Sequence, residues 1–270
     1  MDLSQFSIVV RPGERVDLWA VSGTVAVLDG GRATIGQVLH SGHVTVFRGG
    51  QATIDAVCCS ARVSAHGRVT IGQISDQALA TVGEGGRLTV DEVLGCATVL
   101  VEGGRALIEE IRDNTFVDVS GGLAIIGEVS VQSHLRVSGG LAIVGEVSGD
   151  GALSATWRKT RVTVVNGGRA AIGRLSGASR IHVANAQAVI CEVADRVRVE
   201  VRNEGQVHLG RAFGNSRVYV GVRGRIFIAE VLGHSNVSVH DEGVATIGLA
   251  SDLANISHGG QVVFGMVPPW

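Results

Sequence analysis

A pair of glycines, or a close equivalent, recurs along almost the whole chain, and this repeat constrains the fold more than any other feature. When the second residue of each pair is taken as an anchor, successive anchors lie 17 to 19 residues apart, except in one repeat of 28 residues. The anchors are Gly31, Gly50, Gly67, Gly86, Gly104, Gly122, Gly140, Gly168, Ala186, Gly205, Gly224, Gly243 and Gly260. Repeats of about this length are typical of solenoids, in which each repeat packs mainly against its neighbours.

Apolar residues alternate with polar ones inside each repeat. Positions two and four after the anchor are apolar throughout, and position seven is mostly aliphatic, as in Ala33, Ile35 and Val38. A second alternating run follows at positions 13 and 15, as in Val44 and Val46. This alternation is typical of strands with one buried face, whereas a helix needs 3.6-residue spacing and disfavours a central glycine pair. The pattern predicts strands, not helices.

The predicted fold is all-β, a single parallel β-helix (β-solenoid) of about 13 coils of 18–19 residues. Inward positions fall into three groups, 2 to 4, 7 and 11 to 15, which favours a three-sided cross-section. The glycine pair is expected at a corner that needs positive φ and leaves no room for a side chain. Because solenoid ends need caps, we assign residues 1–20 and 264–270, rich in aromatic residues and proline, to caps and 21–263 to the solenoid.

Composition argues against several classes of partner. The net charge is −2 without long runs of either sign, so we expect no nucleic acid and no anionic membrane. Asp2 stands where a signal peptide would be basic, so cytoplasmic synthesis without a signal peptide is expected. The four cysteines and nine histidines show no metal-ligand spacing, which predicts reduced thiols, no metal site and no cofactor.

Position six carries a column of glutamates on four consecutive repeats. These residues are Glu92, Glu110, Glu128 and Glu146. Stacked carboxylates repel each other, which would raise some of their pKa values or recruit a cation. Such a column could also serve acid/base chemistry on a polysaccharide. The alternative is a solvated acidic ridge, and the sequence leaves both interpretations open.

Aliphatic residues replace polar ones at outward positions near the middle of the chain. This predicted interaction patch consists of Leu107, Leu123, Ile125, Leu141 and Ile143. An exposed apolar area of a few hundred Å² is typical of a protein interface, so we expect a protein partner or a homo-oligomer.

The long repeat contains an insertion within residues 148–161. It holds Trp157, Arg158, Lys159 and Arg161, and loops that interrupt a solenoid commonly present binding residues. A tryptophan beside basic residues is typical of a binding hot spot. In the alternative interpretation, the loop folds back and covers the apolar patch.

In its periodicity, the chain resembles bacterial and phage β-helices, a class that includes tail fibres and spikes, bactofilin-like filaments and pectin-degrading enzymes. No GxSxG, Walker or GxGxxG motif accompanies the repeat. The expected function is therefore non-enzymatic, that of a structural or binding solenoid such as a component of a phage tail, virion or surface assembly. The alternatives are a polysaccharide lyase or hydrolase that uses the glutamate column, and a bactofilin-like filament subunit.

Overall fold

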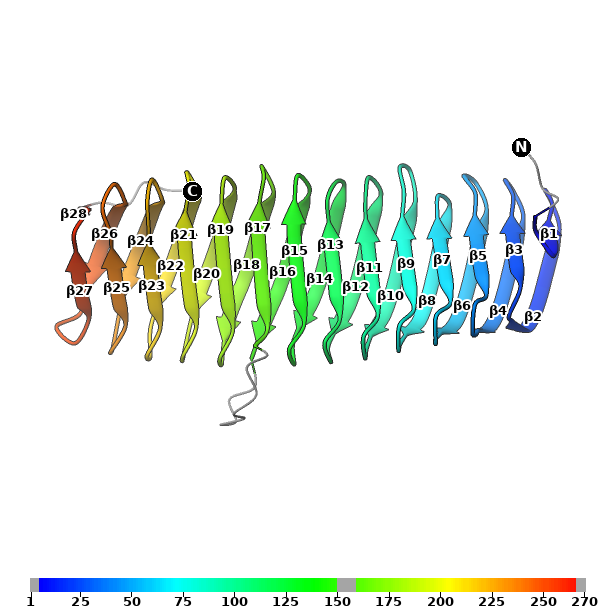
Figure 1. Cartoon of the computed structure of the whole chain (residues 1–270), viewed down its shortest axis with the longest axis horizontal. Coiled ribbons are helices and arrows are strands. Elements are labelled where there is room, and N and C mark those ends of the chain that lie inside the picture. The colour runs from blue at the N-terminus through cyan, green and yellow to red at the C-terminus, as the bar shows by residue number, and fades with distance from the viewer. Residues whose placement is uncertain (1–4, 150–158, 266–270) are drawn as a thin grey trace. The chain divides into compact units, whose positions relative to one another are not determined.

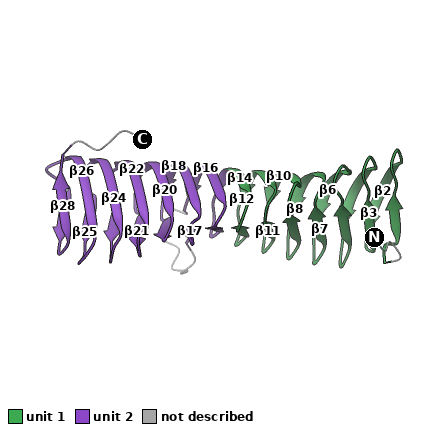
Figure 2. Ribbon diagram, turned by 90° about the horizontal axis from the view of Figure 1, so that it is seen from above, with its two compact units in different colours: residues 1–126 green, residues 127–270 purple. Residues whose placement is uncertain are grey.

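The computed structural model describes residues 5–149 and 159–265. The chain divides into two compact units, Met1–Ile126 and Gly127–Trp270 (Figure 2). The described residues form strands and turns and no helix, hence no helix able to cross a bilayer. The prediction of an all-β fold is confirmed.

The first unit contains two parallel sheets, one of short strands and one of long strands. The short strands are β1 (Ile8–Val10), β3 (Thr24–Val27), β5 (His43–Val46), β7 (Arg62–Ala65), β9 (Leu79–Val82), β11 (Thr98–Val101) and β13 (Phe116–Val119). The long strands are β2 (Arg15–Val21), β4 (Arg32–Val38), β6 (Gln51–Val57), β8 (Arg68–Ile74), β10 (Arg87–Val93) and β12 (Arg105–Ile111). The boundary between the units falls within β14 (Leu123–Val129).

The second unit is built in the same way. Its short strands are β15 (His134–Ser138), β17 (Arg161–Val165), β19 (Arg180–Ala184), β21 (Arg198–Arg202), β23 (Arg217–Val220), β25 (Asn236–Val239) and β27 (Asn255–His258). Its long strands are β16 (Leu141–Ser148), β18 (Arg169–Ser176), β20 (Gln187–Val193), β22 (Gln206–Ala212), β24 (Arg225–Val231), β26 (Val244–Ala250) and β28 (Gln261–Phe264). In each unit, one long and one short strand alternate along the chain to make a coil, which confirms the parallel β-solenoid (Figure 1).

The core consists of columns of aliphatic side chains from equivalent positions of successive coils. Ile35 pairs in register with Ile54, and Ile54 with Ile71, and all three are buried. The short strands contribute a facing column, in which Val44 pairs with Val63. Because β-branched side chains pack well on a pleated surface, one repeated residue type fills the core.

The structure has two sheets where three inward groups were predicted, because two of the groups belong to one strand. In β4 the residues Ile35 and Val38 are both buried although they are three positions apart. Gly36 between them has no register partner in β2 or β6. This irregularity reverses which side chains point inward, so the long strand turns toward the core again at position seven.

The glycine pair acts as predicted, with a different task for each residue. Gly85 has φ of +76°, a backbone conformation that residues with a Cβ atom rarely adopt. At Gly86 a Cβ atom would lie 2.0 Å from the carbonyl oxygen of Ala65 in the preceding coil. The first glycine therefore makes the turn, and the second permits the close approach of two coils.

The segments predicted as caps are only partly described. Residues 1–20 include β1 and most of β2, which pair with β3 and β4. The ring of Phe6 contacts that of Phe47 at a centroid distance of 6.2 Å, whereas the side chain of Trp19 is 86% exposed. Residues 266–270 lie outside the described part, so the cap assignment stays a prediction.

Candidate anion-binding site

Four consecutive short strands of the second unit begin with arginine. We call these residues, Arg161, Arg180, Arg198 and Arg217, the arginine ladder. The strands β17, β19, β21 and β23 pair in parallel, with each arginine in register with the next. Parallel pairing spaces neighbouring strands by about 4.8 Å, so the ladder offers one cation per coil.

A cavity of about 310 Å³ opens beside three of these arginines. Its lining consists of Lys159, Ser179, Arg180, Arg196, Arg198, Asn215 and Arg217. Five of these seven side chains are cationic, and none is acidic. The cavity therefore concentrates positive charge, in a chain whose net charge is −2.

The arginines of the cavity keep their guanidinium groups available. In the described part of the chain, no carboxylate forms an ion pair with Arg180, Arg198 or Arg217. The nearby carboxylate of Asp195 instead accepts a hydrogen bond of 3.2 Å from the backbone N–H of Gly177. Guanidinium groups bind carboxylate, sulfate or phosphate through paired hydrogen bonds, so this arrangement suits an anionic ligand.

A second column on the same strands carries its own charge balance. His182 pairs in register with Glu200, and Glu200 with Tyr219. Glu200 forms an ion pair with Arg202, whose guanidinium carbon lies 4.9 Å from the centroid of the Tyr219 ring. Burial lowers the pKa of His182; the positive charges of Arg202 and Arg161 add to this effect, and Glu200 opposes it. This column is internally neutralised, unlike the arginine ladder.

Three histidines predict how stability depends on pH. Burial is the main cause that lowers the pKa of His43, His182 and His208 below the usual 6.5. The unfolded chain therefore binds protons first as the pH falls through about 6.5, and the folded state loses stability toward the lower folded pKa values. We expect the urea midpoint to fall between pH 6.5 and pH 5. A variant with all three histidines replaced by glutamine should show a flatter profile, and an equally steep one would contradict this origin.

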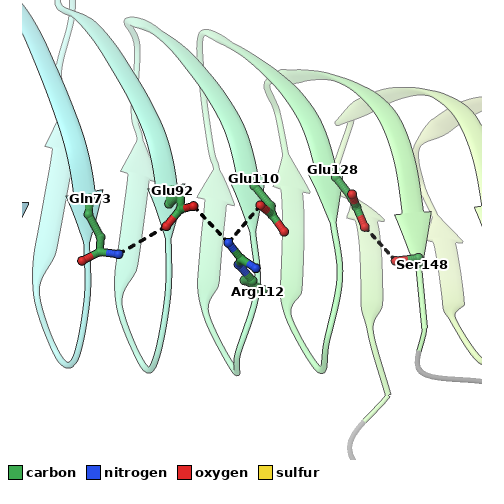
Figure 3. Close-up of polar contacts among 6 residues, drawn as sticks. All are labelled: Gln73, Glu92, Glu110, Arg112, Glu128 and Ser148. Atoms are coloured by element: carbon green, nitrogen blue, oxygen red, sulfur yellow. Dashed lines mark hydrogen bonds and ion pairs between the residues drawn. The ribbon is translucent and has the colours of Figure 1, made fainter. Parts of the chain in front are cut away.

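The predicted glutamate column alternates with cationic and hydroxyl partners in the structure (Figure 3). In the first unit, Arg112 forms ion pairs with Glu92 at 3.0 Å and Glu110 at 3.1 Å, and the side-chain amide of Gln73 donates to Glu92. An arginine thus occupies the place between two carboxylates that a cation would take. The order resembles a solvated, charge-balanced ridge more than a set of bare ligands.

In the second unit the two remaining glutamates accept hydrogen bonds from serines. Ser148 donates to Glu128 at 3.0 Å, and Ser176 donates to Glu146 at 3.2 Å. The position paired with Glu146 in the next coil is Arg174. Cation binding by this column therefore stays a prediction, without a closed set of ligands here.

The residues of the predicted interaction patch point to solvent in both units. Leu107 and Ile125 in the first unit are 49% and 40% exposed, and Leu123 is partly exposed. Leu141 and Ile143 in the second unit are 38% and 42% exposed. Strand alternation therefore placed these aliphatic side chains on the outer surface, as expected.

The insertion contributes directly to the basic cavity. Lys159 lines the cavity, and Arg161 begins the arginine ladder. Trp157 and Arg158, the other two residues predicted to bind a partner, lie outside the described residues.

Sequence reasoning missed Arg180, Arg196, Arg198 and Arg217. The signal was present, because three of them stand 12 residues after their anchors, immediately before the short strand. The 28-residue repeat displaces Arg161 from this count and hides the fourth member. Recurrence at position 12 in consecutive repeats would have revealed the ladder.

Fold and surface together define the class of this chain as a parallel β-solenoid with a basic binding surface. No model of a known protein family matches the chain, and no curated protein and no solved structure matches it either.

Proposed function

We propose that this chain is a non-enzymatic binding solenoid whose arginine ladder holds a linear anionic polymer, with acidic polysaccharide as the ligand class. The observation that carries the proposal is the row of in-register arginines whose cavity contains no acidic side chain. One cation per coil suits a ligand whose own charge repeats along a chain. A component of a phage tail, virion or surface assembly that adheres to such a polymer is the setting we propose.

Polysaccharide fits this surface better than nucleic acid does. Phosphates follow one another at about 3.4 Å along each strand of duplex DNA, against a coil spacing of about 4.8 Å. The cavity lining also contains no aromatic side chain on which an unpaired base could stack. Acidic polysaccharides need neither feature, because they carry carboxylates on successive sugar rings.

The lining of the cavity favours binding over catalysis. It supplies cations, the hydroxyl of Ser179 and the amide of Asn215, but no carboxylate or imidazole to act as a general base. The hydroxyl of Ser179 is itself engaged, because it donates to the carbonyl of Ser176 at 2.9 Å. We therefore expect a bound polymer to be released intact.

Affinity electrophoresis tests the proposal. Gels that contain polygalacturonate should retard the chain, gels with neutral dextran should not, and added salt should relieve the retardation because it screens the charges. Equal mobility in all gels would contradict polyanion binding. Release of unsaturated sugar products during incubation would instead support the alternative of a lyase.

We further propose that the exposed aliphatic positions bind a protein partner, here a second copy of the chain. In the first unit the outward column of β4, β6, β8 and β10 carries threonine at position three, and Leu107 occupies that position in β12. Exposed apolar groups gain free energy when they leave water, so a column that changes from threonine to leucine favours association.

Replacement of Ile125 and Ile143 by glutamate should shift the chain from oligomer to monomer without lowering its thermal midpoint, because both side chains are exposed. Light scattering measures the mass. The matched control changes Thr53 and Thr70, exposed at the same strand position, to glutamate and should leave the mass unchanged. A monomeric parent chain would contradict self-association, and long filaments in negative-stain images would favour the bactofilin-like alternative.

A further inference from the structure

Two adjacent cysteines and an aspartate meet at one corner of the first unit. Cys58 and Cys59 follow β6, and Asp76 follows β8 in the next coil. The two Sγ atoms are 3.9 Å apart, and both lie within 4.8 Å of a carboxylate oxygen of Asp76. Among the described residues, no other group of three or more potential metal ligands gathers so closely.

The backbone of two coils holds this group in place. Cys59 and Asp76 occupy equivalent corner positions, with φ of +62° and +58°. The N–H of Cys59 donates to Oδ2 of Asp76 at 3.1 Å, and the N–H of Gln77 donates to the carbonyl of Cys59 at 2.9 Å. The ligand atoms are therefore positioned by the same register that builds the solenoid.

The sulfur positions match a tetrahedral metal centre. Zn–S bonds of about 2.3 Å in a tetrahedron place two sulfur atoms about 3.8 Å apart, close to the separation of Cys58 and Cys59. Asp76 has a second carboxylate oxygen, so it can coordinate a metal while it accepts the backbone hydrogen bond. Thiolate ligands select zinc and other soft or borderline cations over magnesium and calcium.

We infer that Cys58, Cys59 and Asp76 bind Zn²⁺ as three protein ligands, with the fourth position open to solvent. Sequence spacing conceals this site, because its ligands are two neighbours in one coil and a residue 17 positions further on from Cys59. The site lies in the first unit and is independent of the polyanion surface of the second unit.

Binding of cobalt and zinc to the untagged, metal-free full chain under a phosphine reductant tests the inference. Co²⁺ should produce thiolate-to-metal absorption and the visible bands of a tetrahedral centre, and Zn²⁺ should displace it at about one equivalent. Cys58→Ser and Cys59→Ser should each remove the thiolate absorption of their own sulfur and weaken Zn²⁺ binding by about a hundredfold or more. Asp76→Asn should retain the sulfur bands and bind about tenfold more weakly.

The exposed thiols of Cys96 and Cys191 supply the matched controls. Cys96→Ser and Cys191→Ser should leave the cobalt spectrum and the zinc affinity unchanged. The inference is overturned if the parent chain shows no thiolate-to-cobalt absorption, or if the control variants lose affinity as much as Cys58→Ser does. The parent spectrum decides the matter even where a variant fails to fold.

Discussion

Replacement of both Arg180 and Arg198 by glutamine is expected to weaken polygalacturonate binding by at least about a hundredfold. A charge-assisted hydrogen bond contributes about 1.5–3 kcal/mol, and each 1.4 kcal/mol changes a dissociation constant about tenfold. Both arginines line the basic cavity and lie in register with each other, so the variant removes adjacent cations from the ladder. Isothermal titration calorimetry at low and physiological salt measures the loss.

The control for this experiment is a variant with the same change in net charge elsewhere on the solenoid. Arg68 and Arg87 are exposed, lie in register with each other in the long strands of the first unit, and lie outside the basic cavity. Their replacement by glutamine should reduce binding only slightly, through the general field of the molecule. Equal losses in the two double variants would show that overall charge, not the arginine ladder, attracts the polymer.

Gly86→Ala is expected to destabilise the first unit by about 3 kcal/mol, at the upper end of what overpacking costs. A Cβ atom at this position would stand 2.0 Å from the backbone oxygen of Ala65. Backbone atoms cannot move aside as a flexible side chain can, so two coils must separate locally. Urea unfolding followed by circular dichroism measures the change.

The adjacent residue provides a matched comparison. Gly85 has positive φ but nothing within 4 Å of an added Cβ, so Gly85→Ala should cost only about 1 kcal/mol of backbone strain. A cost for Gly85→Ala as large as that for Gly86→Ala would mean that φ, and not the approach of the coils, makes the glycine pair necessary.

The core could be predicted from the sequence because every coil repeats the same pattern. Apolar residues at positions two and four predict a buried face, and Ile35 and Ile54 are both buried there and paired in register. The number of sheets was less accessible. It depends on the irregularity at Gly36, which reverses the inward face within one strand and leaves no trace in hydrophobicity alone.

The surface was harder to predict than the core, because a surface site depends on which residues neighbour each other across coils. Glu92 and Glu110 were expected to face each other, and they do pair in register. The sequence did not reveal that Arg112 would form ion pairs with both of them. The basic cavity and the thiol pair beside Asp76 likewise depend on turns whose lengths differ between repeats.

In-register stacking makes the coil a unit of valency as well as of structure. Each coil of the second unit between β17 and β23 adds one arginine to the row without altering the contacts of the others. Linked weak contacts multiply in strength, since each further contact forms at high effective concentration. Gain or loss of a whole coil would therefore change avidity in discrete steps, so duplication of one repeat could adjust grip without redesign of any individual contact.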